Sequence, residues 1–390
     1  MTELLLQNQS AISPASYEIR DIKSALTPAL VIYPELVDAN IATTLRLLQH
    51  DARRWRPHVK TAKLGFVMRR LVENGVLQFK CSTTLELQVA CQSGAEDVLL
   101  AYPLAGANTG RLKYLARKYS TKKISVLVDS VEQIQPWAGH SIGVFVDVNP
   151  GMNRTGVAQD RTDALLGLAR SLREARLDIR GVHYYDGHLG SVPPDERENL
   201  AHRGYDRLLE IVQALEEEGI SVREVITSGT PAFLSAISHR GLSSGNFAHQ
   251  VSPGTVVYCD CTSLAQLPPE LGYHPAALVV TTVVSRPLPD RITCDAGHKA
   301  VSADEGVPTC AVLGRPDLRP LKPSEEHLPI EVAAGSKAPH IGEVLYLVPR
   351  HVCPTVNNFD NALLVRDGSI RQVEKVTARG REGPLLGARE

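Results

Sequence analysis

The chain has 390 residues, a length that suits one large barrel with a second module better than one small domain. Its 42 basic and 43 acidic residues give a net charge of -1, which argues against nucleic acid or an anionic membrane surface as a partner. We expect a cytoplasmic protein, because no apolar run is long enough to span a membrane and the first ten residues lack a signal-peptide pattern. The seven cysteines are scattered without CxxC spacing, so no disulfide framework is predicted.

Short β-rich segments alternate with helical patterns up to residue 260. The predicted strands span residues 29–33, 56–60, 78–82, 98–101, 124–128, 143–148, 179–184, 224–227 and 251–258, and the predicted helices span 36–48, 64–73, 84–92, 161–175 and 199–218. This alternation is typical of βαβ units, and their number favours a (β/α)8 TIM-like barrel over an open doubly wound sheet. No GxGxxG motif follows the first strand, which weakens a dinucleotide-binding fold further.

After residue 258 the pattern changes to strands joined by turns that contain Pro and Gly. The predicted strands span residues 277–285, 291–294, 309–312, 330–332, 344–348, 361–366 and 369–373. This is typical of an antiparallel β-domain. We therefore predict an N-terminal segment at 1–27 that joins the β-domain, a barrel at 28–262, the β-domain at 263–376 and a flexible tail at 377–390.

Lys60 ends the strand predicted at 56–60, and α/β barrels carry their chemistry at the carboxyl ends of strands. A barrel mouth can desolvate such a lysine and lower its pKa, which suits an amine that forms a Schiff base. The alternative is a solvated surface charge, a role for which the sequence also offers Lys63 and Lys80.

His351 and Cys353 follow the strand predicted at 344–348, and Pro354 cannot continue a strand's hydrogen bonding. In an extended chain, residues at i and i+2 lie on one face. Imidazole and thiolate together suit zinc or a similar divalent ion with positions left open for water or substrate. The alternative is a buried cysteine beside a solvated histidine. Because Lys60 falls in the other predicted domain, a composite site between domains is a further expectation.

Several segments, in their order along the chain, resemble the D-threonine aldolase and D-serine dehydratase family. These are pyridoxal-phosphate enzymes of the alanine-racemase-like fold, fold type III. The similar segments are Pro-His-Val-Lys-Thr at 57–61, then residues 151–156, 184–188, 228–231, 253–255, 295–299 and 325–327, and the terminal His351-x-Cys353. The resemblance runs from Pro28 to Arg366 and implies an alanine-racemase-like barrel with a C-terminal β-domain.

The resemblance implies that Lys60 binds pyridoxal 5'-phosphate and moves protons on one face of it. It also implies that Ser228, Gly229 and Thr230 receive the phosphate at a helix start, where an ordinary N-cap turn is the alternative. Tyr258, at the end of the last barrel strand, is expected to place its phenol against the cofactor phosphate or at the rim of the barrel.

Three further residues take roles from the same resemblance. Arg154 is expected near the cofactor ring, although it could instead bind a carboxylate. Tyr184 ends a strand and is expected to contact the ring, with barrel packing as the alternative. His188 lies on the following loop and is the candidate second base, with a solvated loop histidine as the alternative.

The function implied is a lyase that acts on D-3-hydroxy amino acids with pyridoxal phosphate and a divalent metal at His351 and Cys353. Zinc is the first expectation for the metal, and manganese, cobalt or magnesium are alternatives. One outcome is β-elimination to a 2-oxo acid and ammonia, and the other is aldol cleavage to glycine and an aldehyde. In the family, aldolases tend to use His and Asp as metal ligands and dehydratases use His and Cys. Cys353 therefore favours a D-serine dehydratase-like reaction, and a D-threonine-type aldolase is the alternative.

Other possibilities stay open at this point. An amino-acid racemase of the same fold would need a second-face acid or base, which Tyr346 or Tyr273 could supply. A non-enzymatic carrier of pyridoxal phosphate would lack the β-domain. The resemblance also implies a homodimer. Arg56, His58 and Arg350 would suit a substrate with a second carboxylate such as 3-hydroxyaspartate, and Glu326 with His327 could orient the metal ligands.

Overall fold

The computed structural model describes residues 14–385 and contains two compact units. The first unit takes in residues 14–44, Thr61–Val67 and Thr255–Gly380, and the second takes in Leu45–Lys60, Met68–Gly254 and residues 381–385. The chain therefore passes between the units several times. This differs from the prediction, in which only the N-terminal segment 1–27 and residues 263–376 form the β-domain and residues 28–262 form an uninterrupted barrel.

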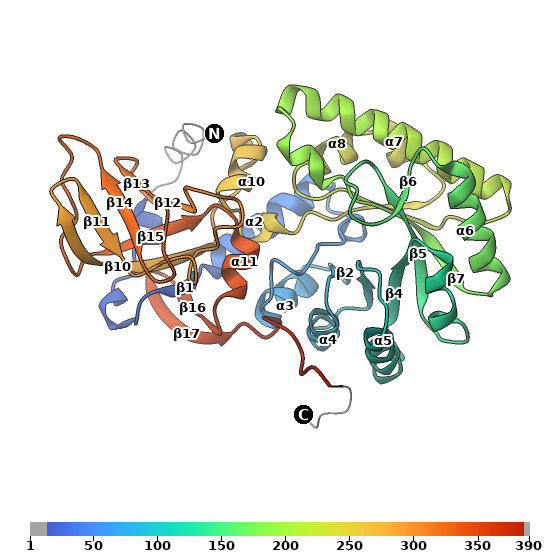
Figure 1. Ribbon diagram of the computed structural model, residues 1–390, viewed down its shortest axis with the longest axis horizontal. Coiled ribbons are helices and arrows are strands. Elements are labelled where there is room, and N and C mark those ends of the chain that lie inside the picture. The colour runs from blue at the N-terminus through green and yellow to red at the C-terminus, as the bar shows by residue number, and fades with distance from the viewer. Residues whose placement is uncertain (1–13, 386–390) are drawn as a thin grey trace. The chain divides into compact units, whose positions relative to one another are not determined.

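The second unit is built on an eight-stranded parallel sheet (Figure 1). Its strands are β2 (Gln78–Cys81), β3 (Asp97–Leu100), β4 (Lys123–Val128), β5 (Gly143–Asn149), β7 (Asp178–Tyr184), β8 (Glu224–Thr227) and β9 (Ala248–Val251) in this order, with β6 (Val157–Ala158) paired to β5. The helices α4 (Thr84–Gln92), α5 (Ala107–Lys118), α6 (Thr162–Glu174) and α7 (Pro194–Glu217) surround the strands, and α8 (Phe233–Ser238) and α9 (Arg240–Ser244) follow β8. Apolar side chains on the strands are buried, as parallel sheets covered by helices require.

The segment before Lys60 connects the two edges of this sheet. It is not a regular strand, but Trp55 forms a parallel bridge with Val251 of β9 and His58 forms one with Lys80 of β2. The Val59 backbone N–H donates to the carbonyl of Lys80 at 2.8 Å. These bridges close the sheet into a barrel and place Lys60 at its carboxyl-terminal end. The predicted barrel is confirmed, while the predicted strand 56–60 is reduced to isolated bridges.

Arg56 lies in a buried ion-pair network near the amino-terminal ends of the strands. Its guanidinium donates to Asp97 of β3 and to Glu224 of β8 at 2.9–3.0 Å. Arg180 of β7 binds the same two carboxylates. Arg56 is fully buried, so the expectation that it binds a substrate carboxylate is wrong. Its guanidinium instead links β3 and β8 through ion pairs with Asp97 and Glu224.

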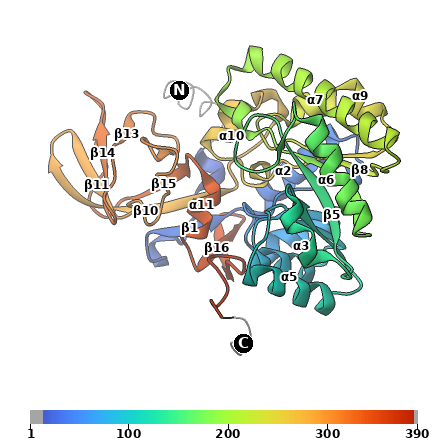
Figure 2. The ribbon, with the colours of Figure 1, turned by 45° about the vertical axis from the view of Figure 1, so that its right-hand side comes forward.

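The first unit contains a nine-stranded, mainly antiparallel sheet (Figure 2). Its path is β13-β14-β11-β10-β1-β16-β17, and β15 pairs with β10 and β12. The strands are β1 (Ala29–Ile32), β10 (Ala277–Leu288), β11 (Arg291–Cys294), β12 (Cys310–Val312), β13 (Leu318–Pro320), β14 (Leu328–Val332), β15 (Val344–Pro349), β16 (Asn361–Arg366) and β17 (Ser369–Lys375). The predicted C-terminal strands are present, and β13 is the one that the sequence pattern missed.

Strand β1 corrects the prediction for residues 29–33. This segment is a strand, but it pairs antiparallel with β10 and parallel with β16 instead of entering the barrel. Its apolar residues are buried in the core of the first unit. The sequence of a short apolar strand does not indicate which strand it will pair with. Of the predicted N-terminal segment, residues 1–13 lie outside the described residues.

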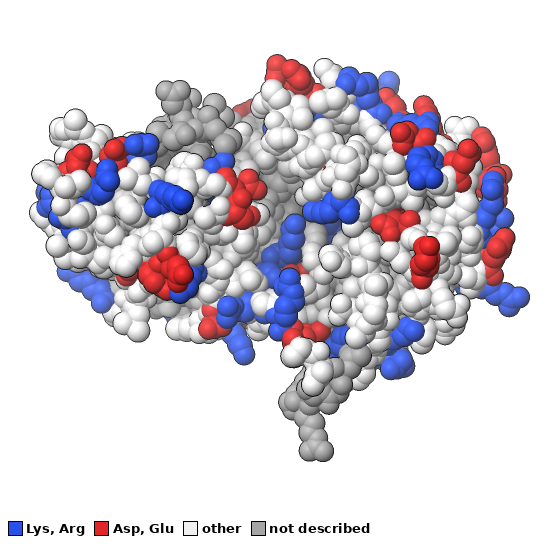
Figure 3. All heavy atoms as spheres, viewed as in Figure 1, with Lys and Arg blue, Asp and Glu red and all other residues white. Residues whose placement is uncertain are grey.

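Four further helices complete the described part of the chain. They are α2 (Pro34–Leu47), α3 (Gly65–Glu73), α10 (Cys261–Gln266) and α11 (Val352–Asn357), with 3-10 turns at Pro14–Tyr17, Ile22–Ser24, Ala52–Arg54, Val131–Gln133, Gln135–Trp137, Gly187–Ser191, Thr255–Val257 and Pro269–Leu271. Within residues 14–385, every helix is too short or too polar to cross a lipid bilayer. Lys and Arg side chains lie among Asp and Glu side chains on the face of the molecule seen in Figure 3. Arg170 and Glu218, for example, form an ion pair at 2.6 Å.

The predicted flexible tail is held by hydrogen bonds over its first residues. Within the first unit, the Ala378 N–H donates to the carbonyl of Lys63 at 2.8 Å and the Lys63 ammonium donates to the carbonyl of Ala378 at 3.3 Å. Lys63 is therefore buried and not the solvated charge that the sequence suggested. In the second unit, Glu382 accepts from Arg111 at 2.5 Å. Residues 386–390 of the tail lie outside the described residues.

Candidate active site

A cavity of about 680 Å³ lies in the second unit at the carboxyl-terminal ends of the barrel strands. Its size is within the usual range for small-molecule and cofactor sites. The residues lining it are His58, Lys60, Lys80, Ser82, Thr83, Thr84, Ala101, Tyr102, Pro103, Leu104, Asn108, Arg154, Thr155, His183, Tyr185 and Arg381. Four of these side chains are Lys or Arg and none is Asp or Glu, so the cavity suits an anionic ligand.

Lys60 and Arg154 both line this cavity, as the resemblance implied. Lys60 is half-buried, and its backbone N–H donates to His58 Nδ1 at 3.3 Å. His58 Nε2 lies 3.0 Å from the Ser82 hydroxyl. The guanidinium carbon of Arg154 lies 5.3 Å from the ring centroid of Tyr185. The structure therefore brings together the predicted lysine and arginine with an aromatic ring.

That ring belongs to Tyr185, whereas the sequence predicted Tyr184. Tyr184 is buried outside the cavity, where its hydroxyl donates to Gln159 at 3.2 Å and its ring packs edge-on against Tyr205. Side chains along a strand alternate between faces, so His183 and Tyr185 point inward while Tyr184 points toward the helices. Tyr184 takes the packing role that was its stated alternative.

A buried chain of polar groups connects Lys80, His183 and Asp147. Lys80 Nζ lies 3.2 Å from His183 Nε2, and His183 Nδ1 lies 2.7 Å from Asp147 Oδ1. Burial and the charge of Lys60 lower the pKa of Lys80 to about 7, against the opposing effect of Asp147. Burial also lowers the pKa of His183. Lys80 is therefore not the solvated charge expected from the sequence, and its position within the buried strand β2 was the signal for this.

His188 lies on the 3-10 turn Gly187–Ser191 and does not line this cavity. Its Nδ1 is buried without a hydrogen-bond partner, and burial lowers its pKa. Its Nε2 faces Gly151, at which an added Cβ would lie 3.8 Å away. Its role as a second base stays a prediction.

The predicted phosphate site has features that fit an added anion. The Ser228 hydroxyl, after β8, and the Ser252 hydroxyl, after β9, are both buried without a hydrogen-bond partner. A Cβ on Gly229 would lie 2.9 Å from the Tyr185 ring, so only glycine fits there without displacement. Burial raises the pKa of Asp186 to about 6, although a hydrogen bond from the Gly229 backbone opposes the shift.

Thr230 and Tyr258 complete the predicted set. Thr230 is buried in the second unit beside Gly229. Tyr258 is fully buried in the first unit, where its hydroxyl donates to the carbonyl of Ala62 at 2.8 Å. Burial raises the pKa of Tyr258 well above its usual value. The phenol is thus already occupied by a backbone acceptor.

The predicted metal ligands lie in the first unit, at the end of β15. His351 is the extended residue before α11, and Cys353 lies in the first turn of that helix, so the two residues do not share a strand. They nevertheless interact, because a hydrogen bond to Cys353 contributes to the pKa of His351. Cys353 Sγ also lies 3.0 Å from the Thr61 hydroxyl. The Val352 N–H donates to Asp260 at 2.8 Å, which fixes the segment between the two ligands.

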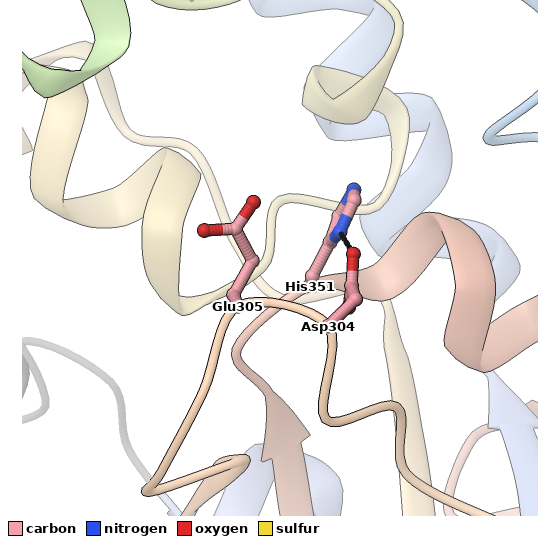
Figure 4. Close-up of side chains that lie close together, drawn as sticks. All are labelled: Asp304, Glu305 and His351. Atoms are coloured by element: carbon pink, nitrogen blue, oxygen red, sulfur yellow. Dashed lines mark hydrogen bonds and ion pairs between the residues drawn. The ribbon is translucent and has the colours of Figure 1, made fainter.

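Two carboxylates that the sequence interpretation missed accompany His351. Asp304 Oδ2 lies 2.6 Å from His351 Nδ1, and Glu305 lies beside them on the same loop (Figure 4). Potential donor atoms of these three residues lie within 4.8 Å of one another. Acidic pairs in loops are common, so only the fold could associate Asp304 and Glu305 with a histidine that is far away in sequence.

The donor set suits a divalent cation. Burial disfavours the imidazolium of His351, but its interactions with Cys353, Asp260 and Asp304 raise its pKa to about 10. Negative groups that stabilise a proton on His351 would also stabilise a metal ion. A carboxylate that binds the Nδ1 of a ligating histidine leaves Nε2 free for the metal. Glu326 is exposed and pairs with Lys299, so the structure does not bring it to this group.

Comparisons with known proteins agree with this architecture. The family model "Alanine racemase, N-terminal domain" matches residues 32–261, and "Putative serine dehydratase domain" matches residues 276–365. D-threonine aldolase of Arthrobacter sp is 29% identical over 363 residues, covering 91% of this chain and 93% of that protein. D-threo-3-hydroxyaspartate dehydratase of Delftia sp. (strain HT23) is 26% identical over 377 residues, covering 90% and 97%.

A solved structure gives the same relationship. The crystal structure of D-threonine aldolase from Filomicrobium marinum superposes with a TM-score of 0.82 at 28% identity, covering 92% of this chain and 96% of that one. These relatives are aldolases and dehydratases, and the predictions of an alanine-racemase-like fold and of a pyridoxal-phosphate-dependent lyase are confirmed. The chain belongs to the family defined by the alanine racemase N-terminal domain and is similar to D-threonine aldolase and D-threo-3-hydroxyaspartate dehydratase.

Proposed function

We propose that this protein is a lyase that acts on D-3-hydroxy amino acids with pyridoxal 5'-phosphate and a divalent metal, and that its reaction is β-elimination to a 2-oxo acid and ammonia. The observation that carries the proposal is the position of Lys60 in a cavity lined by cations and without a lining carboxylate. When bound, pyridoxal phosphate would stabilise negative charge that develops at Cα of an amino acid.

The residues of the second unit divide this task between them. Lys60 would hold the cofactor through its amine, and Arg154 and the ring of Tyr185 line the cavity that encloses it. The orphaned hydroxyls of Ser228 and Ser252 would donate to phosphate oxygens, which would satisfy two buried groups that otherwise have no partner.

In the first unit, His351 and Cys353 would hold the metal, and Asp304 would orient the imidazole. A metal held by these residues would supply Lewis-acid chemistry toward a substrate hydroxyl. Cys353 supports elimination, since the dehydratase side of the family pairs His with Cys. Zinc is the first choice for a site with imidazole and thiolate, with manganese, cobalt or magnesium as alternatives.

Aldol cleavage to glycine and an aldehyde is the second candidate, because the aldolase of Arthrobacter sp is 29% identical to this chain. A racemase is less favoured. The Tyr346 hydroxyl accepts from the Ile19 N–H at 3.2 Å, and the Tyr273 hydroxyl lies 2.9 Å from the Thr44 hydroxyl. Both tyrosines that could serve as a second-face base are therefore engaged within the first unit.

Product analysis tests the proposal. Purified protein loaded with pyridoxal phosphate is given D-threonine with and without a chelator. We expect 2-oxobutanoate and ammonia, and their formation should stop when the chelator removes the metal. Glycine and acetaldehyde would identify the aldolase instead. A turnover rate that the chelator does not change would exclude a metal held by His351 and Cys353 from the reaction.

Two further assignments belong to the same proposal. We expect a homodimer, as the family resemblance implies, and sedimentation velocity at micromolar concentration tests this. All seven cysteines are free and buried, which fits a reducing compartment and supports the expected cytoplasmic location.

A further inference from the structure

We infer that Lys80 is a second acid–base residue of the cavity: its amine exchanges the proton at Cα of the substrate, and His183 and Asp147 are positioning residues for that amine. The inference rests on the lyase reaction proposed above and adds a group to it. Lys60 is the competing candidate for the same proton, and the experiments below separate the two lysines.

The geometry places the Lys80 amine inside the barrel. Lys80 lines the cavity together with Lys60 but is only 2% exposed. It reaches His183 Nε2 at 3.2 Å, although β3, β4 and β5 separate their strands in the sheet order. The contact therefore crosses the barrel interior. A lysine that only provided surface charge would extend its amine to solvent.

The hydrogen-bond chain fixes the direction in which protons can move. The Asp147 carboxylate accepts from His183 Nδ1–H at 2.7 Å, which leaves Nε2 as an acceptor for one N–H of Lys80. A neutral amine in this arrangement keeps a lone pair that can accept a proton. The arrangement resembles the general case in which a base is oriented by a second group that is oriented by a third.

The charges around Lys80 favour an amine that can change its protonation state near neutrality. Besides burial, the positive charges of Lys60 and Arg56 disfavour the ammonium, while Asp147 and Asp186 favour it. The ring of Tyr185, whose centroid lies 5.3 Å from Nζ, is the aromatic neighbour. The pKa of about 7 that results is near the best value for a group that both takes and returns a proton at neutral pH.

The step itself balances. Neutral Lys80 takes the Cα proton and becomes an ammonium, and the electron pair of the C–H bond remains on Cα. In elimination this pair forms the Cα=Cβ bond as the Cβ–O bond breaks and hydroxide leaves with the pair of that bond. In aldol cleavage the Cα–H bond stays intact. A base takes the proton of the β-hydroxyl, the Cα–Cβ bond breaks to release the aldehyde, and Lys80, which starts as the ammonium, gives its proton to the electron pair left on Cα of the glycine that forms. Lys80 thus has a role under either product outcome.

The first test observes the amine directly. In full-length protein labelled with 15N at lysine Nζ, one resonance that disappears in Lys80→Arg should titrate near pH 7. Replacing His183 with Phe should move this midpoint, whereas His183→Gln, which keeps a hydrogen-bonding side chain, should restore it partly. An unchanged midpoint in His183→Phe, or the absence of any lysine that titrates below pH 9, would overturn the inference.

The second test measures exchange of the Cα proton of D-alanine with D2O in the protein loaded with pyridoxal phosphate. D-alanine has no β-hydroxyl, so neither lyase outcome interferes. We expect exchange to fall by roughly 100-fold or more in Lys80→Arg. Methylamine should restore part of the exchange in Lys80→Ala. The exposed Lys118→Arg is the matched control and should exchange like the wild type.

The outcomes distinguish this inference from the proposed function. Exchange in Lys80→Arg within threefold of the wild type would assign the proton to Lys60 and overturn the inference, even if lyase products form. The protein could instead show exchange that depends on Lys80 but form neither lyase product. That result would support the inference about Lys80 and contradict the proposed lyase reaction. Trapping the cofactor on Lys60 with borohydride in every variant confirms that the cofactor remains bound.

Discussion

Lys80 illustrates how the protonation of one side chain depends on its neighbours. An exposed lysine keeps its charge far above neutral pH, but burial and the proximity of Lys60 lower the pKa of Lys80 to about 7. The ion pair that would usually offset burial is replaced here by a neutral acceptor, His183. A folded protein carries such a group at a cost in stability, which makes it a candidate for function.

Replacement of Lys80 with Met should raise the free energy of unfolding, and the gain should depend on pH. Between the folded pKa of about 7 and the unfolded value of 10.5, the unfolded chain binds a proton that the folded chain does not. Stability of the wild type therefore increases with pH across this window. The difference between Lys80→Met and wild type should be about 4 kcal/mol larger at pH 7 than at pH 10.5. Urea denaturation at both pH values measures it, with Lys118→Met as control, and equal differences would contradict it.

Asp304 is the residue that orients His351, so Asp304→Asn should weaken metal binding. The amide cannot accept a proton from Nδ1 with the strength of a carboxylate, and we expect a loss of affinity of roughly 10- to 100-fold. Competition with a chromogenic chelator measures the affinity. Glu326→Gln, on an exposed loop of the same unit, is the control and should bind metal like the wild type. An unchanged affinity in Asp304→Asn would exclude His351 as a ligand oriented in this way.

At the scale of elements, the alternation along β7 decides which tyrosine belongs to the cavity. The sequence located the strand well, since the predicted range 179–184 lies within Asp178–Tyr184. The faces of the strand were not evident, because the polar and apolar residues in its sequence DIRGVHY do not alternate regularly. His183 inside and Tyr184 outside could be distinguished only once neighbouring strands were in place.

The ion-pair network at the opposite end of the barrel provides an element-scale prediction. Arg56 joins the segment before Lys60 to β3 and β8 through Asp97 and Glu224. Burial would raise the pKa of Asp97, but Arg56 and Arg180 outweigh it and hold the pKa below its usual value. The stability from this carboxylate is therefore present above its unfolded pKa and is lost as pH falls through the folded value.

Arg56→Met should lower the free energy of unfolding by about 3–5 kcal/mol at neutral pH, because it leaves buried carboxylates with fewer partners. Its acid unfolding midpoint should move to higher pH. Circular dichroism during denaturant and pH titrations measures both effects. Arg170→Met, which removes a solvent-accessible ion pair, is the control and should change the free energy of unfolding much less than Arg56→Met. A small effect in Arg56→Met would mean that water or backbone groups compensate the carboxylates.

At the scale of the whole molecule, the chain is not divided into two consecutive domains. The sheet of the first unit takes β1 from near the N-terminus and places it between β10 and β16. The predicted β-domain 263–376 therefore lacks one of its own internal strands. Most of its other strands are as the sequence pattern indicated.

A fragment of residues 263–376 should consequently fail to fold. Without β1, the strands β10 and β16 each expose an unpaired edge and an apolar face, which favours aggregation. Circular dichroism and size-exclusion chromatography should show an aggregated or unfolded fragment. A fragment with residues 14–44 fused through a flexible linker is the matched comparison and should recover β-structure. A folded, monomeric 263–376 fragment would contradict the topology.

The sequence by itself determined the alternating barrel pattern, the β-rich C-terminal region, and the family resemblance from which Lys60, Arg154, His351 and Cys353 are predicted as site residues. These follow from local periodicity and from short motifs, which a linear chain records. The tertiary structure alone decided that β1 pairs with C-terminal strands, that Lys80 meets His183, and that Asp304 meets His351. Each of these is a contact between residues far apart in sequence, and burial and charge at such contacts depend on neighbours that periodicity does not specify.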